Sequence, residues 1–122
     1  MTGPRRELLL AALADVVAVL VFVAMGRTSH HESLTGLPGT AAPFLLGLVV
    51  AWAVVRPSRA PRAISTGLAL GPLTAGVGVA LRVSAFHDSA ATAFIVVAFV
   101  TLTVLIAGWR SAMRLVEGAR RA

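Results

Sequence analysis

Four apolar segments separated by short polar stretches constrain what this chain can fold into. They cover residues 8–25, 40–55, 63–82 and 90–109. Each helical residue advances about 1.5 Å, so helices of roughly this length cross a hydrocarbon core of about 30 Å. Charged residues make up 13% of the chain, against about 25% in soluble domains. The sequence predicts one domain over residues 1–122, an all-α, four-helix transmembrane bundle without a separate soluble domain.

Arginine is distributed unevenly among the five polar stretches, and this predicts an orientation. Nine of the 11 basic residues lie in the first, third and fifth stretches: Arg5, Arg6, Arg56, Arg59, Arg62, Arg110, Arg114, Arg120 and Arg121. The second and fourth stretches hold one each, Arg27 and Arg82. Because cytoplasmic loops carry the excess of basic residues, we expect both termini and the middle loop to be cytoplasmic. Trp52 and Trp109 then fall at cytoplasmic helix ends, where indole rings prefer the interface.

The formal charge of +6 raises the alternative of nucleic-acid binding, since clustered arginine is the usual footprint of phosphate recognition. The arginines flank apolar segments, however, and aromatic residues make up only 6% of the chain, so we expect no nucleic-acid partner. The absence of cysteine excludes disulfides and cysteine-based metal centres. The first apolar segment is longer than the roughly 7–15 residues of a secretory signal. It is therefore predicted to be an uncleaved transmembrane helix.

The two stretches that contain histidine resemble each other. Residues 27–33 read Arg-Thr-Ser-His-His-Glu-Ser, and residues 82–89 read Arg-Val-Ser-Ala-Phe-His-Asp-Ser. A similar offset relates Arg6 to Arg62 and Trp52 to Trp109. This pattern predicts two helical hairpins in the same orientation, as in parallel membrane repeats. The alternative is that short polar loops draw repeatedly on the same few residue types.

Asp15 is the most unusual residue, because it lies within the first apolar segment. Seven residues into that segment, it is about 10 Å from the predicted cytoplasmic end. A charge inside a membrane helix costs at least about 2.5–3.5 kcal/mol, so Asp15 is expected to face the bundle interior. One interpretation is a proton or ion site. The other is a protonated carboxyl group bonded to a threonine of another helix, with these candidates: Thr66, Thr74, Thr101 and Thr103.

The third apolar segment carries a stripe of small residues at spacings of three and four: Gly67, Gly71, Thr74, Gly78 and Arg82. Small residues let membrane helices approach closely, so Gly67, Gly71 and Gly78 are expected at helix contacts. The same stripe predicts that the guanidinium of Arg82 points into the outer mouth of the bundle. If the two helical hairpins are repeats, Asp15 of the first corresponds to Gly71 of the second. The carboxylate of Asp15 would then face a position that no side chain fills.

Charged and histidine side chains are expected to gather in the two outer loops: Arg27, Ser29, His30, His31, Glu32, Arg82, His87 and Asp88. One interpretation is a polar cap in which the arginines pair with the acids. A second is a site for protons or anions. A third is a metal site, or a haem held between His31 and His87, since imidazole ligates such metals. The spacing matches no metal motif, so we expect no metal and no cofactor.

Conventional enzyme signatures are absent: there is no Gly-rich phosphate loop, no His-Glu-x-x-His helix and no Gly-x-Ser-x-Gly elbow. The chain is therefore expected not to be an enzyme. The leading hypothesis is a protein that handles protons or a small ion through Asp15 and the outer cluster. The alternative is a non-catalytic accessory or scaffold subunit of a larger membrane complex. The expected partners are the lipid bilayer and either further copies of the chain or a larger membrane complex. A metal- or haem-binding component is the third hypothesis.

Several of these residues also carry a resemblance to a known family. An aspartate in the first helix is followed by Gly26-Arg27-Thr28-Ser29-His30, and Pro43-Phe44-Leu45 stands near the start of the second helix. In these features the chain resembles a family of small actinobacterial membrane proteins that is catalogued as a domain of unknown function. The resemblance implies a four-helix protein of the bacterial cytoplasmic membrane. It implies no activity, substrate or cofactor.

Overall fold

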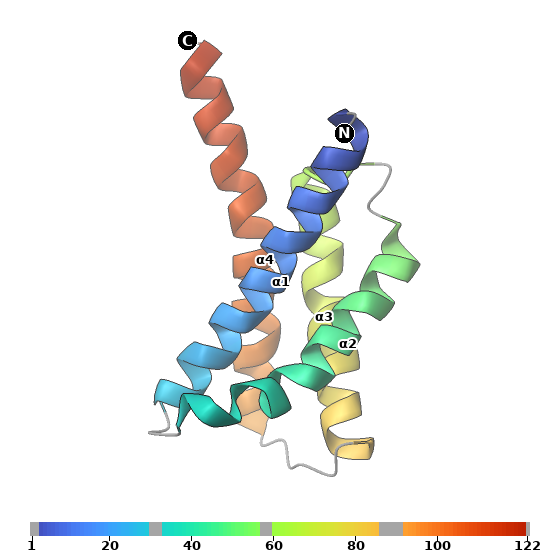
Figure 1. The fold of residues 1–122 in the computed structure, drawn as a ribbon, viewed down its shortest axis with the longest axis vertical. Helices are drawn as coiled ribbons and strands as arrows, with labels where there is room; N and C mark the ends of the chain where they lie inside the picture. The colour runs from blue at the N-terminus through green and yellow to red at the C-terminus, as the bar shows by residue number, and fades with distance from the viewer. Residues whose placement is uncertain (1–2, 30–32, 57–59, 86–91, 122) are drawn as a thin grey trace.

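The computed structural model is a bundle of four long helices (Figure 1). It describes residues 3–29, 33–56, 60–85 and 92–121. The helices are α1 (Gly3–Ser29), α2 (Leu37–Val55), α3 (Ile64–Ser84) and α4 (Thr92–Arg121), and a short 3₁₀ turn, η1 (Leu34–Gly36), precedes α2. The part of the chain that is described contains no strand. The predicted all-α, four-helix architecture is therefore confirmed.

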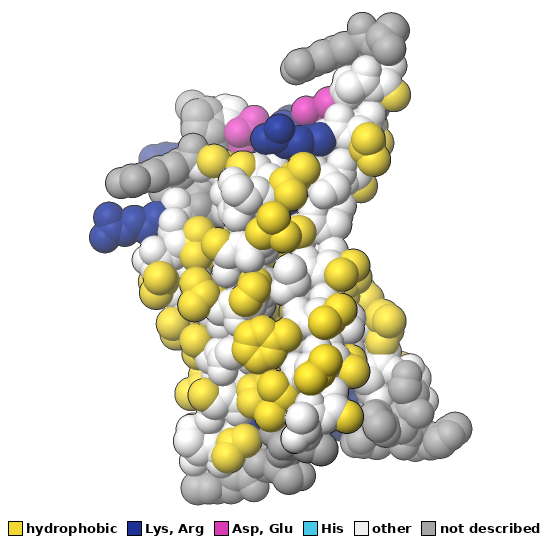
Figure 2. Space-filling model, turned by 180° about the vertical axis from the view of Figure 1, so that it is seen from behind, with side chains coloured by type: hydrophobic (Ala, Val, Ile, Leu, Met, Phe, Trp, Pro, Cys, Tyr) yellow, Lys and Arg dark blue, Asp and Glu magenta, His cyan; other side chains and the backbone are white. Residues whose placement is uncertain are grey.

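All four helices are long and apolar enough to cross a membrane, over these spans: Arg5–Thr28, Leu34–Val55, Ile64–Ser84 and Thr92–Arg120. Only 22% to 39% of the residues in their most apolar windows are buried inside the bundle, so most of this apolar surface faces outward. Figure 2 shows hydrophobic side chains spread over most of one face of the molecule. A soluble protein does not expose apolar surface of this extent, whereas a bilayer covers it. The chain is a membrane-embedded protein.

The two ends of the bundle differ in what they carry. Both termini lie at one end together with the connection between α2 and α3, and we call this the N/C end (Figure 1). The ends of α1 and α3 and the starts of α2 and α4 lie at the opposite end, the far end. The last turns of α4 project past the other helices at the N/C end. Acidic and basic side chains gather towards the N/C end in the view of Figure 2.

The outermost helices extend beyond the apolar segments that predicted them. α1 begins at Gly3 and ends at Ser29, and α4 continues to Arg121, whereas the apolar segments span residues 8–25 and 90–109. Arginine, glutamate and alanine are good helix formers, so helical hydrogen bonding continues into the polar flanks. An apolar segment marks where the chain meets lipid, and not where its helix ends.

Glycines of α3 allow its close contacts with the neighbouring helices. Gly67 and Gly71 lie against α4, and a Cβ on Gly71 would come within 2.5 Å of the Cα of Thr103. Gly78 lies against α2, where the ring of Phe44 occupies the space that a side chain would need. The contacts predicted for these three glycines are therefore present in the structure. Because glycine has no side chain, it lets the helix backbones approach closely, which favours van der Waals packing between membrane helices.

An aromatic cluster joins three helices in the far half of the bundle. Phe22 of α1, Phe44 of α2 and Phe94 of α4 have ring centroids 5.3 to 6.3 Å apart. The guanidinium carbon of Arg82 lies 4.7 Å from the ring centroid of Phe94, a cation–π distance. The cluster gives α1 a packing contact in the half of the bundle that is distant from Asp15.

Candidate functional site

The carboxylate of Asp15 is enclosed by hydrogen-bond donors from two other helices. Its side chain on α1 is completely buried, with 0% of its surface exposed. Oδ1 accepts hydrogen bonds from Nη1 of Arg110 at 2.8 Å and from Nε1 of Trp109 at 2.8 Å. Oδ2 accepts from Nη2 of Arg110 at 3.0 Å and from Nε1 of Trp52 at 3.0 Å. Each carboxylate oxygen therefore has two donors.

Arg110 of α4 is also completely buried, and its guanidinium is engaged on several sides. Besides its two bonds to Asp15, Nε donates to the carbonyl oxygen of Pro61 at 2.8 Å. Nη1 also donates to the carbonyl oxygen of Ile106 at 2.9 Å. The guanidinium carbon lies 4.3 Å from the ring centroid of Trp109. Four of the five N–H donors of this side chain thus have protein acceptors.

Local sequence explains why this arginine can lie inside the bundle. Gly67 of α3 faces α4 at this level, and a Cβ there would come 3.1 Å from Cδ of Arg110 and 2.8 Å from Cα of Ala107. Without a side chain at position 67, the stem of Arg110 passes between the two helices. Pro61, in the connection before α3, then supplies a carbonyl oxygen to the guanidinium. The glycine stripe therefore makes room for the arginine as well as for helix packing.

The pair is neutral as a whole, and its hydrogen-bonding groups are used except for one N–H of Arg110, which is an arrangement that permits charges in an apolar interior. A bidentate carboxylate–guanidinium pair forms strong, directional hydrogen bonds. Removing either member would leave an uncompensated buried charge, which typically costs about 3–5 kcal/mol. The network also joins α1, α2, α4 and the α2–α3 connection at one point. Its first chemical consequence is to fix the helices to one another near the N/C end.

The structure corrects the partners that were expected for Asp15. Its carboxylate is held by a guanidinium and two indoles, and not by a threonine. Thr66 donates to the carbonyl oxygen of Ala60 at 2.7 Å, and the buried hydroxyl of Thr74 has no hydrogen-bond partner among the described residues. Gly71 faces Thr103 of α4, so it does not provide an unfilled position opposite the acid. The expectation that Asp15 points inward agrees with its complete burial.

Sequence reasoning missed the three donor residues because each had a simpler explanation. Membrane topology accounts for Arg110 as one of the cytoplasmic arginines, and the preference of indole rings for the membrane interface accounts for Trp52 and Trp109. One signal in the sequence did point to them. All three stand at the ends of the second and fourth apolar segments, on the side at which Asp15 lies in the first. Equal depth in antiparallel helices is a necessary condition for contact.

Much of the outer cluster lies beyond what the structure describes. His30, His31, Glu32, His87 and Asp88 fall outside the described residues, as does the side chain of Ser29. The expected pairing of arginines with Glu32 and Asp88 therefore remains a prediction.

The two arginines of that cluster are described. Arg27 donates from Nε to the carbonyl oxygen of Ser33 at 2.6 Å and from Nη1 to Oγ1 of Thr40 at 2.7 Å. These bonds fasten the end of α1 to η1 and to the first turn of α2. Arg82 packs on Phe94. Within the described ranges, no three His, Cys, Asp or Glu residues come together as metal ligands would.

Comparison with known proteins gives a family. No curated protein and no solved structure matches the chain. The sequence profile of the family DUF3054, described as a protein of unknown function, matches residues 12–113. The matched region includes Asp15, both tryptophans and Arg110, which together form the buried network. The chain therefore belongs to the DUF3054 family of proteins of unknown function.

Proposed function

We propose that this protein is a non-catalytic subunit or scaffold of a larger assembly in the cytoplasmic membrane of an actinobacterium. The observation that carries the proposal is the way in which the carboxylate of Asp15 is hydrogen-bonded. All four of its hydrogen bonds come from the protein itself and tie together α1, α2 and α4. Arg110 extends this network to the α2–α3 connection through its bond to the carbonyl oxygen of Pro61. The buried charge thus serves to hold the bundle in one arrangement, as a scaffold requires.

The same geometry speaks against Asp15 as a carrier of protons or small ions. A proton on this carboxyl group would have to displace one of four donors, because both oxygens already accept two bonds. A small cation at the carboxylate would lie beside the guanidinium of Arg110, whose charge repels it. Transport through this point would require the pair to separate.

The orientation proposed here places the N/C end in the cytoplasm. Its support is the basic side chains, since α1 begins next to Arg5 and Arg6, and α4 ends with Arg120 and Arg121. Positively charged flanks remain on the cytoplasmic side during insertion. The projecting last turns of α4 then extend into the cytoplasmic interface (Figure 1). Leu115, six residues before the end of α4 at Arg121, has 75% of its surface exposed. We propose this projection as the contact for a partner subunit.

Photo-crosslinking in native membranes tests the scaffold proposal. A photoreactive residue at Leu115 is expected to give a protein adduct of one defined mass. The matched control is the same residue at Leu46, an exposed apolar position near the middle of the α2 span, whereas Leu115 lies close to the end of the α4 span. Only lipid adducts are expected at Leu46. Equal adduct patterns at the two positions would contradict a specific partner at the projection of α4.

Reconstitution addresses the competing transport hypothesis. Purified protein in liposomes is expected to give no proton or cation flux above that of protein-free liposomes. Flux that is present in the wild type and lost in Asp15→Asn would overturn the scaffold proposal in favour of transport.

A further inference from the structure

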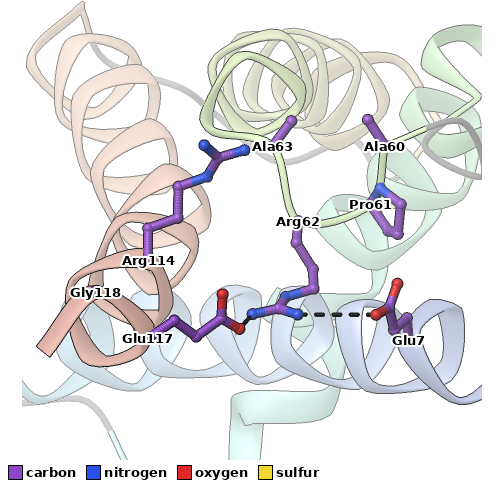
Figure 3. A pocket seen from close by; sticks show the side chains of 8 residues that line it. All are labelled: Glu7, Ala60, Pro61, Arg62, Ala63, Arg114, Glu117 and Gly118. Atoms are coloured by element: carbon purple, nitrogen blue, oxygen red, sulfur yellow. Dashed lines mark ion pairs between the residues drawn. The ribbon is translucent and has the colours of Figure 1, made fainter. Parts of the chain in front are cut away.

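A cavity of about 500 Å³ opens at the N/C end between α1, α4 and the α2–α3 connection (Figure 3). Its lining includes two acids and two bases: Glu7, Arg62, Arg114 and Glu117. Pro61 also lines it, and the carbonyl oxygen of Pro61 is the one that accepts a hydrogen bond from Arg110. The wall of the cavity is therefore hydrogen-bonded directly to a member of the buried ion pair.

The four charged side chains that line the cavity differ in how closely they are paired with one another. Arg62 reaches down from the connection between the two acids, forming an ion pair with Glu117 and a longer one of 3.8 Å with Glu7 (Figure 3). Arg114 projects from α4 into the cavity towards Ala63, with no hydrogen bond or ion pair to any described residue. Among the described residues, a guanidinium without an ion-pair partner and a weakly engaged carboxylate thus lie on different sides of one cavity.

The cavity lies next to the ends of the membrane spans of α1 and α3, while the span of α4 continues past it to Arg120. The span of α1 begins at Arg5, two residues before Glu7, and the span of α3 begins at Ile64, next to Ala63. On the same face of α1, Leu10 follows Glu7 by three residues, and its side chain is exposed. A polar cavity beside exposed apolar surface, at the end of these two spans, is placed for an amphiphilic molecule. The polar part of such a molecule lies at the depth of lipid headgroups.

We propose that this cavity binds the headgroup of a membrane lipid that carries both a phosphate and a primary ammonium group. The phosphate contacts the guanidinium of Arg114, because planar N–H donors suit phosphate oxygens. The ammonium group contacts the carboxylate of Glu7, which it reaches with its N–H donors. The acyl chains leave along the exposed leucine side of α1. The N-terminus of α3, which begins at Ile64 and has Ala63 as its N-cap, adds a favourable helix dipole on the phosphate side.

A zwitterionic headgroup fits this arrangement better than the alternatives do. An anionic headgroup without an amine would match Arg114 but place negative charge near Glu7 and Glu117. A quaternary ammonium has no N–H group to donate to a carboxylate. The proposal is independent of the scaffold function, since a lipid site at the inner interface suits any membrane protein of this shape.

Lipid binding by the purified full chain tests the proposal. Native mass spectrometry in a neutral detergent, with phosphatidylethanolamine, phosphatidylcholine and phosphatidylglycerol of equal chain length, compares the three headgroups. Phosphatidylethanolamine is expected to be retained best. Arg114→Ala and Glu7→Gln are each expected to weaken its binding roughly tenfold, the size of one charge-assisted hydrogen bond. Arg120→Ala is the matched control on α4 and is expected to bind like the wild type.

Soluble competitors distinguish a lipid site from a phosphate site. O-phosphoethanolamine is expected to displace the lipid, whereas inorganic phosphate at the same concentration is expected to displace much less. Equal retention of the three lipids, preference for phosphatidylglycerol, equal displacement by inorganic phosphate, or an equal loss in Arg120→Ala would each overturn the proposal. Thermal unfolding of each variant verifies that it is folded, and the wild-type lipid comparison does not depend on any variant.

Discussion

Asp15 and Arg110 are 95 residues apart in the chain, yet they form a bidentate pair with both N···O distances between 2.8 and 3.0 Å. The pair lies inside a bundle whose outer surface is apolar, and two indole N–H groups complete it. Charges in such surroundings are tolerated only with partners, so the pair makes one specific arrangement of α1 against α4 much more stable than others.

Breaking the pair from one side is expected to destabilise the protein strongly. Arg110→Met leaves the carboxylate of Asp15 buried with only the two indoles as donors. The free energy of unfolding in detergent is expected to fall by about 3–5 kcal/mol. Thermal unfolding followed by circular dichroism measures the loss.

The double variant Asp15→Leu with Arg110→Met is the control for this prediction, because it removes both charges and keeps side-chain volume. It is expected to be more stable than Arg110→Met alone, since no unpaired charge remains. If the double variant were as unstable as the sum of the two single variants, the pair would not be coupled, contrary to the structure.

The two tryptophans are expected to contribute through their N–H groups and not only through packing. Trp52→Phe and Trp109→Phe each remove one donor to the carboxylate of Asp15, at a cost of about 1.5–3 kcal/mol for a bond to a charged group. The loss is expected to be larger for Trp109, because its ring also contacts the guanidinium of Arg110. Chemical unfolding in detergent ranks the two variants.

Combining each tryptophan change with Asp15→Asn distinguishes a hydrogen bond from packing. The cost of Trp52→Phe is expected to shrink in the Asp15→Asn background, since the amide is a weaker acceptor than the carboxylate. An unchanged cost would show that the indole acts by packing alone.

Replacing glycine by alanine is expected to destabilise the protein where the glycine lies in a helix contact, and not where the space around it is open. Gly71→Ala introduces a Cβ that would come within 2.5 Å of Cα of Thr103, so α3 and α4 must move apart. Overpacking of this kind costs about 1–3 kcal/mol. Gly108→Ala of α4 and Gly26→Ala of α1 are the controls, because nothing lies within 4 Å of the added atom. Both controls are expected to be neutral or slightly stabilising, because alanine favours helix. The test compares the melting temperatures of the three variants. Equal changes at all three positions would contradict the close contact of α3 with α4 at Gly71.

The proposed orientation is testable by cysteine labelling, since the chain has no cysteine of its own. Thr35→Cys near the far end is expected to react with a membrane-impermeant maleimide in intact spheroplasts. Ala119→Cys and Ala60→Cys at the N/C end are expected to react only after permeabilisation. Labelling of the N/C positions in intact spheroplasts would reverse the proposed orientation.

Sequence was sufficient for the architecture because the apolar segments are long and the polar stretches short. The burial of Asp15 followed from the cost of a charge in a membrane helix. The contacts of Gly67, Gly71 and Gly78 followed from their spacing on one helix face.

The partner of Asp15 was not predictable in the same way. An arginine at the end of an apolar segment, such as Arg110, is explained equally well by membrane topology. Only the relative placement of α1 and α4 shows that its long side chain turns inward. The outer cluster that includes His31 and His87 lies outside the described residues and stays a prediction.

The order in which the pair is synthesised has a consequence for biogenesis. α1 leaves the ribosome first and α4 last, so the acid enters the membrane 95 residues ahead of its arginine. At about 5–20 residues per second, this separation is on the order of 5 to 20 s of translation. During this interval the first helix carries a carboxylate whose guanidinium does not yet exist. The first helix can therefore reach its final packing in the bundle only after α4 has been synthesised. A polypeptide that stops before α4 retains an acid without its arginine within the bilayer.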